Sequence, residues 1–241
     1  MAQAGSPGSP SFDGVQLGPS TDYVELVREQ LKSGSVWPSG DSGSHQGVRR
    51  AIDAVEGTPA ERHLLDALLE LLGDEDAAVR SGAIHLAWDY ADKVNAEILL
   101  RALNDHPELY EGVKPVGLPE SYMPDLAWGL IQAMNANPKP DAQVIARLRR
   151  AAEDPDNGFR VFGGLAAHDS DWLIEHASKL VSQQPVRARI ILGNLRTPKR
   201  REQFVKALAN EPPGFRKDLV GAIAEKVSNS SERERLNAIL T

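Results

Sequence analysis

The sequence predicts an all-α protein, and three observations point to this fold class. Aromatic residues make up only 5% of the 241 residues, whereas Ala, Leu, Glu and Arg are plentiful, a composition that favours helices over a β-sandwich. From residue 58 onward, apolar residues recur at helical spacing in one segment after another. Short polar turns with Gly, Pro, Asp or Asn separate these segments.

Composition excludes several classes of protein. The absence of cysteine rules out disulfides and thiolate-bound metals. The 27 Lys and Arg against 34 Asp and Glu give a net charge of −7, and no apolar run approaches the roughly 18 residues of a membrane span. Because the first basic residue is Arg28, the N-terminus lacks the charged region of a signal peptide. We therefore expect a soluble, cytoplasmic protein that does not act on membranes.

The N-terminal part differs from the rest in composition. Gly, Pro and Ser account for 11 of the first 20 residues, so this stretch cannot bury enough apolar surface to fold and is expected to be disordered. A helix at about 21–32, a connector at 33–47 with ten Gly, Ser or Pro, and a short helix at 48–55 follow. Three regions result: a disordered tail at 1–19, tethered helices with a Gly/Ser-rich linker at 20–57, and a helical body at 58–241.

The helical body opens with a well-marked helix start. Thr58 is expected as the N-cap, with Pro59 at the first helical position and Glu61 completing a capping box. The helix carries a one-sided apolar stripe of Leu64, Leu65, Leu68, Leu69 and Leu72. A polar turn and a second amphipathic helix follow, which predicts an αα-hairpin.

This hairpin pattern repeats along the chain. A shift of 80 residues places Val79–Arg80 on Phe159–Arg160, and a shift of 40 places Leu86–Trp88 on Leu126–Trp128. A long turn rich in Pro and Gly interrupts the second repeat between residues 104 and 123. The expected hairpins lie at 58–92, 94–135, 140–168, 170–196 and 198–227, and a last helix lies at 230–240.

The turn phrase resembles that of the HEAT-like repeats. The best matches are residues 74–83 (DEDAAVRSGA) and 156–167, where an acidic turn precedes an apolar residue, an arginine and an Ala-rich helix. The resemblance implies a right-handed α-solenoid of about five hairpins, with the second helices lining a concave side. We expect Arg80, Arg160 and Arg216 to be structural, because each can reach the turn or last carbonyls of a neighbouring repeat. The alternative is an irregular helical bundle.

Two tryptophans are candidates for a binding surface. Helical geometry points Trp88 away from the core direction of its helix, and Trp128 is about 130° from that of its own. The 40-residue shift continues to His168, and Asp169 matches Asp89. We therefore expect a column of Trp88, Asp89, Trp128, His168 and Asp169 on the concave side, because Trp is enriched at binding hot spots. The alternative is that each Trp packs against the adjacent repeat.

A metal site is a further hypothesis. The pair His168–Asp169, with Asp171, Glu175 and His176 nearby, is similar to the signature of the HD phosphohydrolases, which are all-helical metal enzymes. That family needs a further upstream His on a nearby helix, and none occurs between His106 and His168. Ser170 is more simply an N-cap. No nucleophile with its base, phosphate loop or HExxH motif is found, so we expect no catalytic role, metal or cofactor.

Charge divides unevenly along the chain. Residues 185–241 hold 12 Lys and Arg against six Asp and Glu, a net of +6, which leaves −13 for the first 184 residues. The candidate basic patch consists of Arg187, Arg189, Arg196, Lys199, Arg200 and Arg201. It is compatible with nucleic-acid binding of the kind seen in helical-repeat DNA glycosylases, or simply with a solvated face.

The favoured function is non-enzymatic protein binding. An acidic concave face with a Trp column would engage a basic partner, in the manner of helical-repeat immunity proteins or regulatory scaffolds. Head-to-tail self-association of the acidic and basic ends is also expected to be possible. Nucleic-acid binding through the C-terminal repeats and metal-dependent phosphohydrolysis remain the alternatives.

Overall fold

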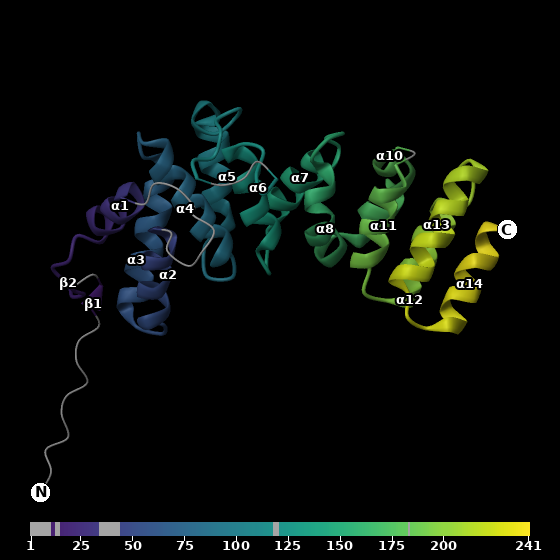
Figure 1. Ribbon diagram of the computed structural model, residues 1–241, viewed down its shortest axis with the longest axis horizontal. Coiled ribbons are helices and arrows are strands. Elements are labelled where there is room, and N and C mark those ends of the chain that lie inside the picture. The colour runs from purple at the N-terminus through teal and green to yellow at the C-terminus, as the bar shows by residue number, and fades with distance from the viewer. Residues whose placement is uncertain (1–10, 13–14, 34–43, 118–120, 183) are drawn as a thin grey trace, which may run out of the picture. The chain divides into compact units, whose positions relative to one another are not determined.

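The structure is a computed structural model that describes residues 11–12, 15–33, 44–117, 121–182 and 184–241. Apart from one short strand pair, its regular elements are helices, which confirms the expected all-α class (Figure 1). The chain divides into two compact units, residues 1–138 and 139–241, which are described separately here. We call them the first and the second unit.

The first unit contains a strand pair and six α-helices among its described residues. The elements are β1 Ser11–Phe12, β2 Val15–Gln16, α1 Tyr23–Ser33, α2 Ser44–Ala54, α3 Pro59–Glu70, η1 Leu71–Gly73, α4 Ala77–Asp89, α5 Ala96–Asp105, η2 Pro107–Leu109 and α6 Leu126–Ala136, where η marks a 3-10 helix. The hairpins expected at 58–92 and 94–135 correspond to α3–α4 and α5–α6.

The second unit contains eight α-helices among its described residues. They are α7 Ala142–Ala152, η3 Gly158–Val161, α8 Phe162–His168, α9 Ser170–Glu175, α10 Ala177–Val181, α11 Pro185–Asn194, α12 Pro198–Ala207, α13 Pro213–Lys226 and α14 Ser230–Leu240. The expected hairpins at 140–168, 170–196 and 198–227 match these elements, and the last helix lies where it was predicted.

The N-terminal segment is more ordered than expected where it is described. Residues 11–12 pair with 15–16 in an antiparallel ladder, and Leu17 is buried. The remainder of the expected tail at 1–10 and 13–14, and residues 34–43 of the expected connector, lie outside the described residues. Helices α1 and α2 both pack on α3 and α4, so the structure divides after residue 138, whereas the sequence led us to expect a boundary at 58.

Helix starts follow the expected chemistry with two differences. Asp76, Asp125 and Asp141 cap α4, α6 and α7 by accepting backbone N–H groups. Thr58 occupies the N-cap position of α3, but its hydroxyl donates to the Val55 carbonyl, and Glu61 accepts the Gly57 N–H at 2.7 Å. The capping box is therefore displaced by one residue. Similarly, Ser170 begins α9 rather than capping it.

In the first unit, helix α4 packs along α6 in a parallel arrangement. A Cβ on Gly129 of α6 would lie 2.7 Å from Ile84 Cγ2 of α4, so the two backbones approach closely at this glycine. At the far end, the Asn137 side chain donates to the carbonyls of Ala91 (2.8 Å) and Val94 (3.2 Å), just past the end of α4. The two contacts relate α4 to α6 by a shift of about 45 residues.

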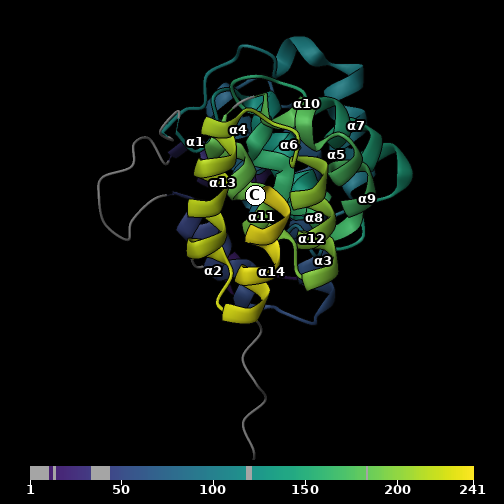
Figure 2. The same cartoon turned by 90° about the vertical axis from the view of Figure 1, so that its right-hand side faces the viewer.

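In the second unit, second helices of successive hairpins also stack. Helix α8 packs on α11, and α11 on α13, while α9 and α10 contact α12, and α12 contacts α14. Figure 2 looks onto the C-terminal end of this unit, where α13 and α14 lie side by side. Each of these helices buries an apolar stripe that neither partner could cover alone.

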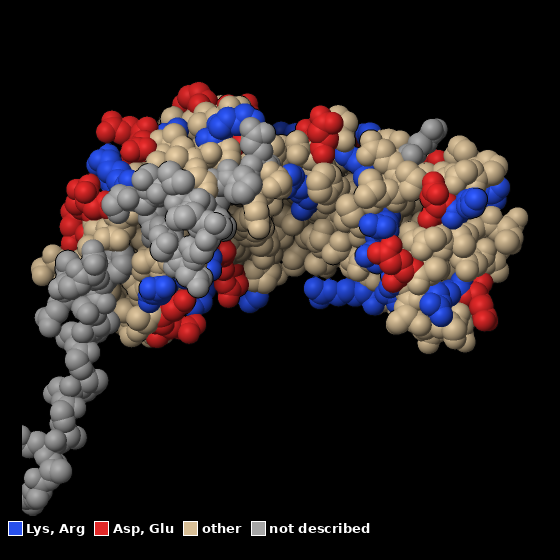
Figure 3. All heavy atoms as spheres, in the orientation of Figure 1, with Lys and Arg blue, Asp and Glu red and all other residues tan. Residues whose placement is uncertain are grey.

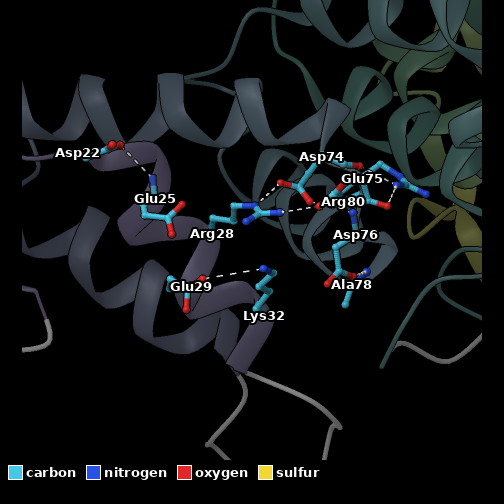
Figure 4. A network of polar contacts seen from close by, with 10 residues as sticks. All are labelled: Asp22, Glu25, Arg28, Glu29, Lys32, Asp74, Glu75, Asp76, Ala78 and Arg80. Carbon is cyan, nitrogen blue, oxygen red and sulfur yellow. Dashed lines mark hydrogen bonds and ion pairs between the residues drawn. The ribbon is translucent and has the colours of Figure 1, made fainter.

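Arg80 stabilises the turn between α3 and α4 from its buried side. Its guanidinium is buried and donates to the carbonyls of Asp74 (2.7 Å) and Glu75 (3.0 Å) (Figure 4). On the other side of the same turn, Arg28 of α1 donates to the Asp74 carboxylate at 2.6 Å. Burial acts to raise the pKa of Asp74, but the hydrogen bonds from Arg28 and the Asp76 N–H outweigh it, so this pKa lies below its ordinary value. The ion pair fastens α1 to the α3–α4 turn.

The same device recurs at the corresponding arginines of the second unit. Arg187, only 3% exposed, donates to the carbonyls of Leu180 (2.9 Å), Asp154 (2.7 Å) and Pro155 (2.6 Å). Arg216 donates to the Leu240 carbonyl at 2.8 Å, and Arg160 to the Asn157 side chain at 3.3 Å. Arg187 and Arg216 thus donate to carbonyls of neighbouring elements, whereas Arg80 and Arg160 contact the turns of their own hairpins.

We predict that replacing Arg187 by Met lowers the free energy of unfolding by about 2–4 kcal/mol, because three carbonyls, that of Leu180 in a buried contact, lose their donor. The control is Arg196→Met, since Arg196 is exposed and makes no ion pair within the described residues; its effect should stay within about 0.5 kcal/mol. Urea denaturation measures both. Equal effects of the two substitutions would show that the carbonyl contacts of Arg187 do not stabilise the fold.

Candidate partner-binding site

The two tryptophans of the expected column are half-buried, and they lie at different heights along the paired helices α4 and α6. Trp88 is in the last turn of α4, and its ring meets His85 edge-on at 6.3 Å, whereas Trp128 is in the first turn of α6. The observed 45-residue relation between α4 and α6 places Trp128 beside residue 83, about five residues or 7–8 Å along the axis from Trp88. The 40-residue register expected for them is therefore wrong, because the long turn before α6 shifts its start.

Asp89 is engaged by a neighbouring helix rather than being free. Arg49 of α2 forms an ion pair with its carboxylate, and His85 Nε2 lies 3.7 Å from it. Asp89 is also the single acidic residue within α4, and α6 contains none. The second helices of the first unit therefore do not form the acidic face that we expected; the carboxylates lie on first helices and turns instead.

The sequence predicted a helix at 48–55, but not its first turn or its contact with α4. His45, which we expected in a connector, lies in α2, and with Arg49 and Asp53 it forms a stripe at i, i+4 and i+8. The Tyr90 hydroxyl donates to Asp53 at 2.6 Å, and burial followed by this contact raises the pKa of Tyr90. The signal was the four-residue spacing of His45, Arg49 and Asp53, which matches that of His85 and Asp89.

His168 and Asp169 belong to the second unit and have different surroundings. His168 is exposed at the end of α8. Asp169 accepts a hydrogen bond of 2.5 Å from Arg149 Nε, and this hydrogen bond is the main cause of the raised pKa of Arg149. A salt-bridged carboxylate is a poor ligand for a metal. Within the described ranges, no three His, Cys, Asp or Glu side chains gather where they would hold a metal ion.

Two other residues of the expected metal site, Asp171 and His176, also contact neighbouring side chains. Asp171 pairs with Arg200, and His176 stacks on Trp172 with ring centroids 4.5 Å apart. The guanidinium of Arg149 lies over the Trp172 ring, 5.6 Å from its centroid. Trp172 is half-buried and was not singled out in the sequence. Its neighbours show that these residues form a packed aromatic and ionic cluster.

The expected basic patch contains two structural arginines, of which Arg187 is buried and Arg201 is half-buried. Arg187 satisfies turn carbonyls, as described above, and so cannot contact a partner. Arg201 donates to both carboxylate oxygens of Glu232 (2.7 and 3.1 Å) and to the Leu195 carbonyl (2.7 Å), which joins α12 to α14. The physical reason is the long side chain, which reaches back to unsatisfied groups at helix ends.

The other members of the patch are at the surface. Arg200 pairs with Asp171, and Arg189 with Glu225 at 3.0 Å. Arg196 and Lys199 are exposed and make no ion pair with any described residue. The cationic surface left for a ligand is therefore smaller than the sequence suggested.

The two units nevertheless carry opposite net charges. The first unit holds 21 Asp and Glu against nine Lys and Arg, a net of −12, and the second holds 13 against 18, a net of +5. In the face drawn in Figure 3, acidic side chains lie over α1 and beside the end of α5. The exposed carboxylates of the first unit that have no ion-pair partner among the described residues include Glu70, Glu97, Asp105 and Glu111. We call these four the acidic set.

Comparison of the chain with known protein families, curated proteins and solved structures found no match. None of the helices described is long and apolar enough to cross a membrane. The function is therefore argued from the surfaces and contacts above.

We predict that Arg201→Met destabilises the second unit by about 2–4 kcal/mol, because it leaves the Glu232 carboxylate buried without its partner. Arg200→Met removes the same charge from an exposed pair and should cost less than about 1 kcal/mol. Thermal unfolding followed by circular dichroism distinguishes the two. A loss for Arg200→Met as large as that for Arg201→Met would contradict the assignment.

Proposed function

We propose that this protein is a non-enzymatic scaffold of HEAT-like hairpins whose acidic first unit binds a basic protein partner. The observation that carries the proposal is the net charge of −12 on the first unit together with the unpaired acidic set. A surface with this excess of carboxylates attracts a basic partner over long range and speeds its encounter.

The α-solenoid arrangement is part of this proposal. In the first unit α4 stacks on α6, and in the second α8, α11 and α13 stack in succession, as expected for a ladder of hairpins. The arginines at equivalent turn positions support the likeness to HEAT-like repeats: Arg80 binds the carbonyls of its own turn, Arg187 those of the preceding turn, and Arg216 the last helix carbonyl of Leu240. A handedness and a concave face are inferences from that likeness.

The binding surface that we propose differs from the one expected from sequence. The acidic set lies on α3, on α5 and just after η2, which are first helices and turns of their hairpins. Trp88 and Asp89 lie on the opposite helix layer, where Arg49 neutralises the carboxylate. We therefore assign recognition of the partner's positive charge to the acidic set. Trp88 would supply only an apolar contact with the same partner.

The acidic set is tested by affinity capture from cells with quantitative mass spectrometry. The test variant replaces the set by amides: Glu70→Gln, Glu97→Gln, Asp105→Asn and Glu111→Gln. The matched control makes four exposed changes in the second unit: Asp156→Asn, Glu175→Gln, Asp218→Asn and Glu234→Gln. Basic proteins should be retained by the wild type and the control, and reduced at least about tenfold in the test variant.

Three outcomes would overturn the proposal. Retention of the same partners by the test variant would show that the acidic set is not used. Loss of all partners after nuclease treatment, with dependence on Arg196 and Lys199, would establish nucleic-acid binding instead. A salt-sensitive dimer detected by light scattering, with no other partner, would indicate association of the oppositely charged units of two copies.

A further inference from the structure

Helix α2 meets α4 through two histidine rings that lie against each other. His45 of α2 and His85 of α4 are edge-on, with ring centroids 5.2 Å apart and planes at 73°. The close approach depends on Gly82, because a Cβ there would lie 3.1 Å from His45 Nε2 and 2.7 Å from Leu31 Cδ2. One turn further along, Arg49 pairs with Asp89. The contact between the helices is therefore polar along one side of α2.

The surroundings of these rings favour their neutral forms. The Nδ1 atom of His85 is buried and has no hydrogen-bond partner. Charged groups reach the pair from two helices: Asp89 from α4, which favours protonation, and Arg49 from α2, which opposes it. Helix α1 contributes the apolar side chain of Leu31. Because Asp89 is already paired with Arg49, it does not compensate two further positive charges.

We propose that α2 is an acid-released cover of α4: uptake of protons by His45 and His85 undocks α2 and frees Asp89 from Arg49. The apolar residues Val48 and Ile52, both fully buried, hold the helix in place at neutral pH. Two imidazolium rings about 5 Å apart repel each other and lose hydration. The contact between His45 and His85 therefore becomes unfavourable when both are protonated. That the freed Asp89 then serves a basic partner rests on the proposed function; the release itself does not.

The direction of the pH effect follows from the pKa values of the two histidines when α2 is docked and when it is free. Burial, then the neighbouring His85, lowers the pKa of His45 from 6.5 to about 4, and burial lowers the pKa of His85. The undocked state therefore binds protons more tightly. Docking is fully favourable above pH 6.5 and weakens as the pH falls toward 4. At pH 5, the titration of His45 alone weakens docking about 30-fold, and His85 adds to it.

Hydrogen exchange with mass spectrometry on the full chain tests the release. After correction for intrinsic exchange rates, the amides of 44–54 should lose about 30-fold or more in protection between pH 7 and pH 5, whereas those of α12 and α13 should not. His45→Gln combined with His85→Gln should abolish most of this difference. The matched control is His63→Gln, since His63 is exposed on α3, and it should behave as wild type.

A second variant covers the case in which the double substitution fails to fold. Gly82→Ala places a methyl group against His45 and Leu31, so α2 should be unprotected already at pH 7, with circular dichroism otherwise retained. Unchanged protection of 44–54 at pH 5 in the wild type would overturn the proposal. An equal loss in the folded double variant would also overturn it, because the histidines would not be the cause.

Binding of decalysine separates this inference from the proposed function. If Asp89 becomes available on release, affinity for decalysine should rise at pH 5 in the wild type and not in Asp89→Asn. A loss of α2 protection without this rise would refute the role of Asp89 and leave the release standing. A loss of decalysine binding in the acidic-set variant at pH 7, with the release intact, would support the proposed function independently.

Discussion

The structure depends on side chains that satisfy the carbonyl groups left unpaired where helices end. Each helix leaves its last carbonyls without an internal partner, and a stack of short helices has many such ends. Arg80 and Arg187 supply donors to turn carbonyls, and the Tyr110 hydroxyl donates to the Leu72 carbonyl at 2.9 Å from inside the core. Asn137 does the same for the turn after α4. The polar contacts thus fix which hairpin stacks on which, while the apolar stripes provide the driving force.

This constraint also changes the meaning of the charge distribution. An arginine that is buried against carbonyls adds to the net charge of the chain but offers nothing to a ligand. Arg187 is of this kind, and the half-buried Arg201 likewise binds the Leu195 carbonyl, so part of the positive charge of the second unit serves internal contacts. The carboxylates of the first unit are different, because the acidic set lies exposed and unpaired among the described residues. The recognition that we propose therefore rests on the acidic unit.

Helix α2 shows how a polar contact can be both structural and conditional. Its apolar side is buried against the first unit. Its polar side contacts α4 through His45, His85 and the Arg49–Asp89 ion pair. Aliphatic packing is insensitive to pH, whereas buried imidazoles are not. A helix held by both kinds of contact can therefore leave without unfolding the hairpins beneath it.

The sequence by itself determined the helical class and the positions of the hairpins, because helical periodicity and turn chemistry are local properties. It did not determine the register between hairpins: Trp128 is displaced from Trp88 because the long connection between η2 and α6 sets where α6 begins. Nor could it separate Arg187 from Arg196, which look alike in composition but differ in burial. The partners of His45 and Asp89 were decided by the tertiary structure alone, since α2 and α4 meet across about 40 residues of chain, and such long-range contacts leave no periodic signal.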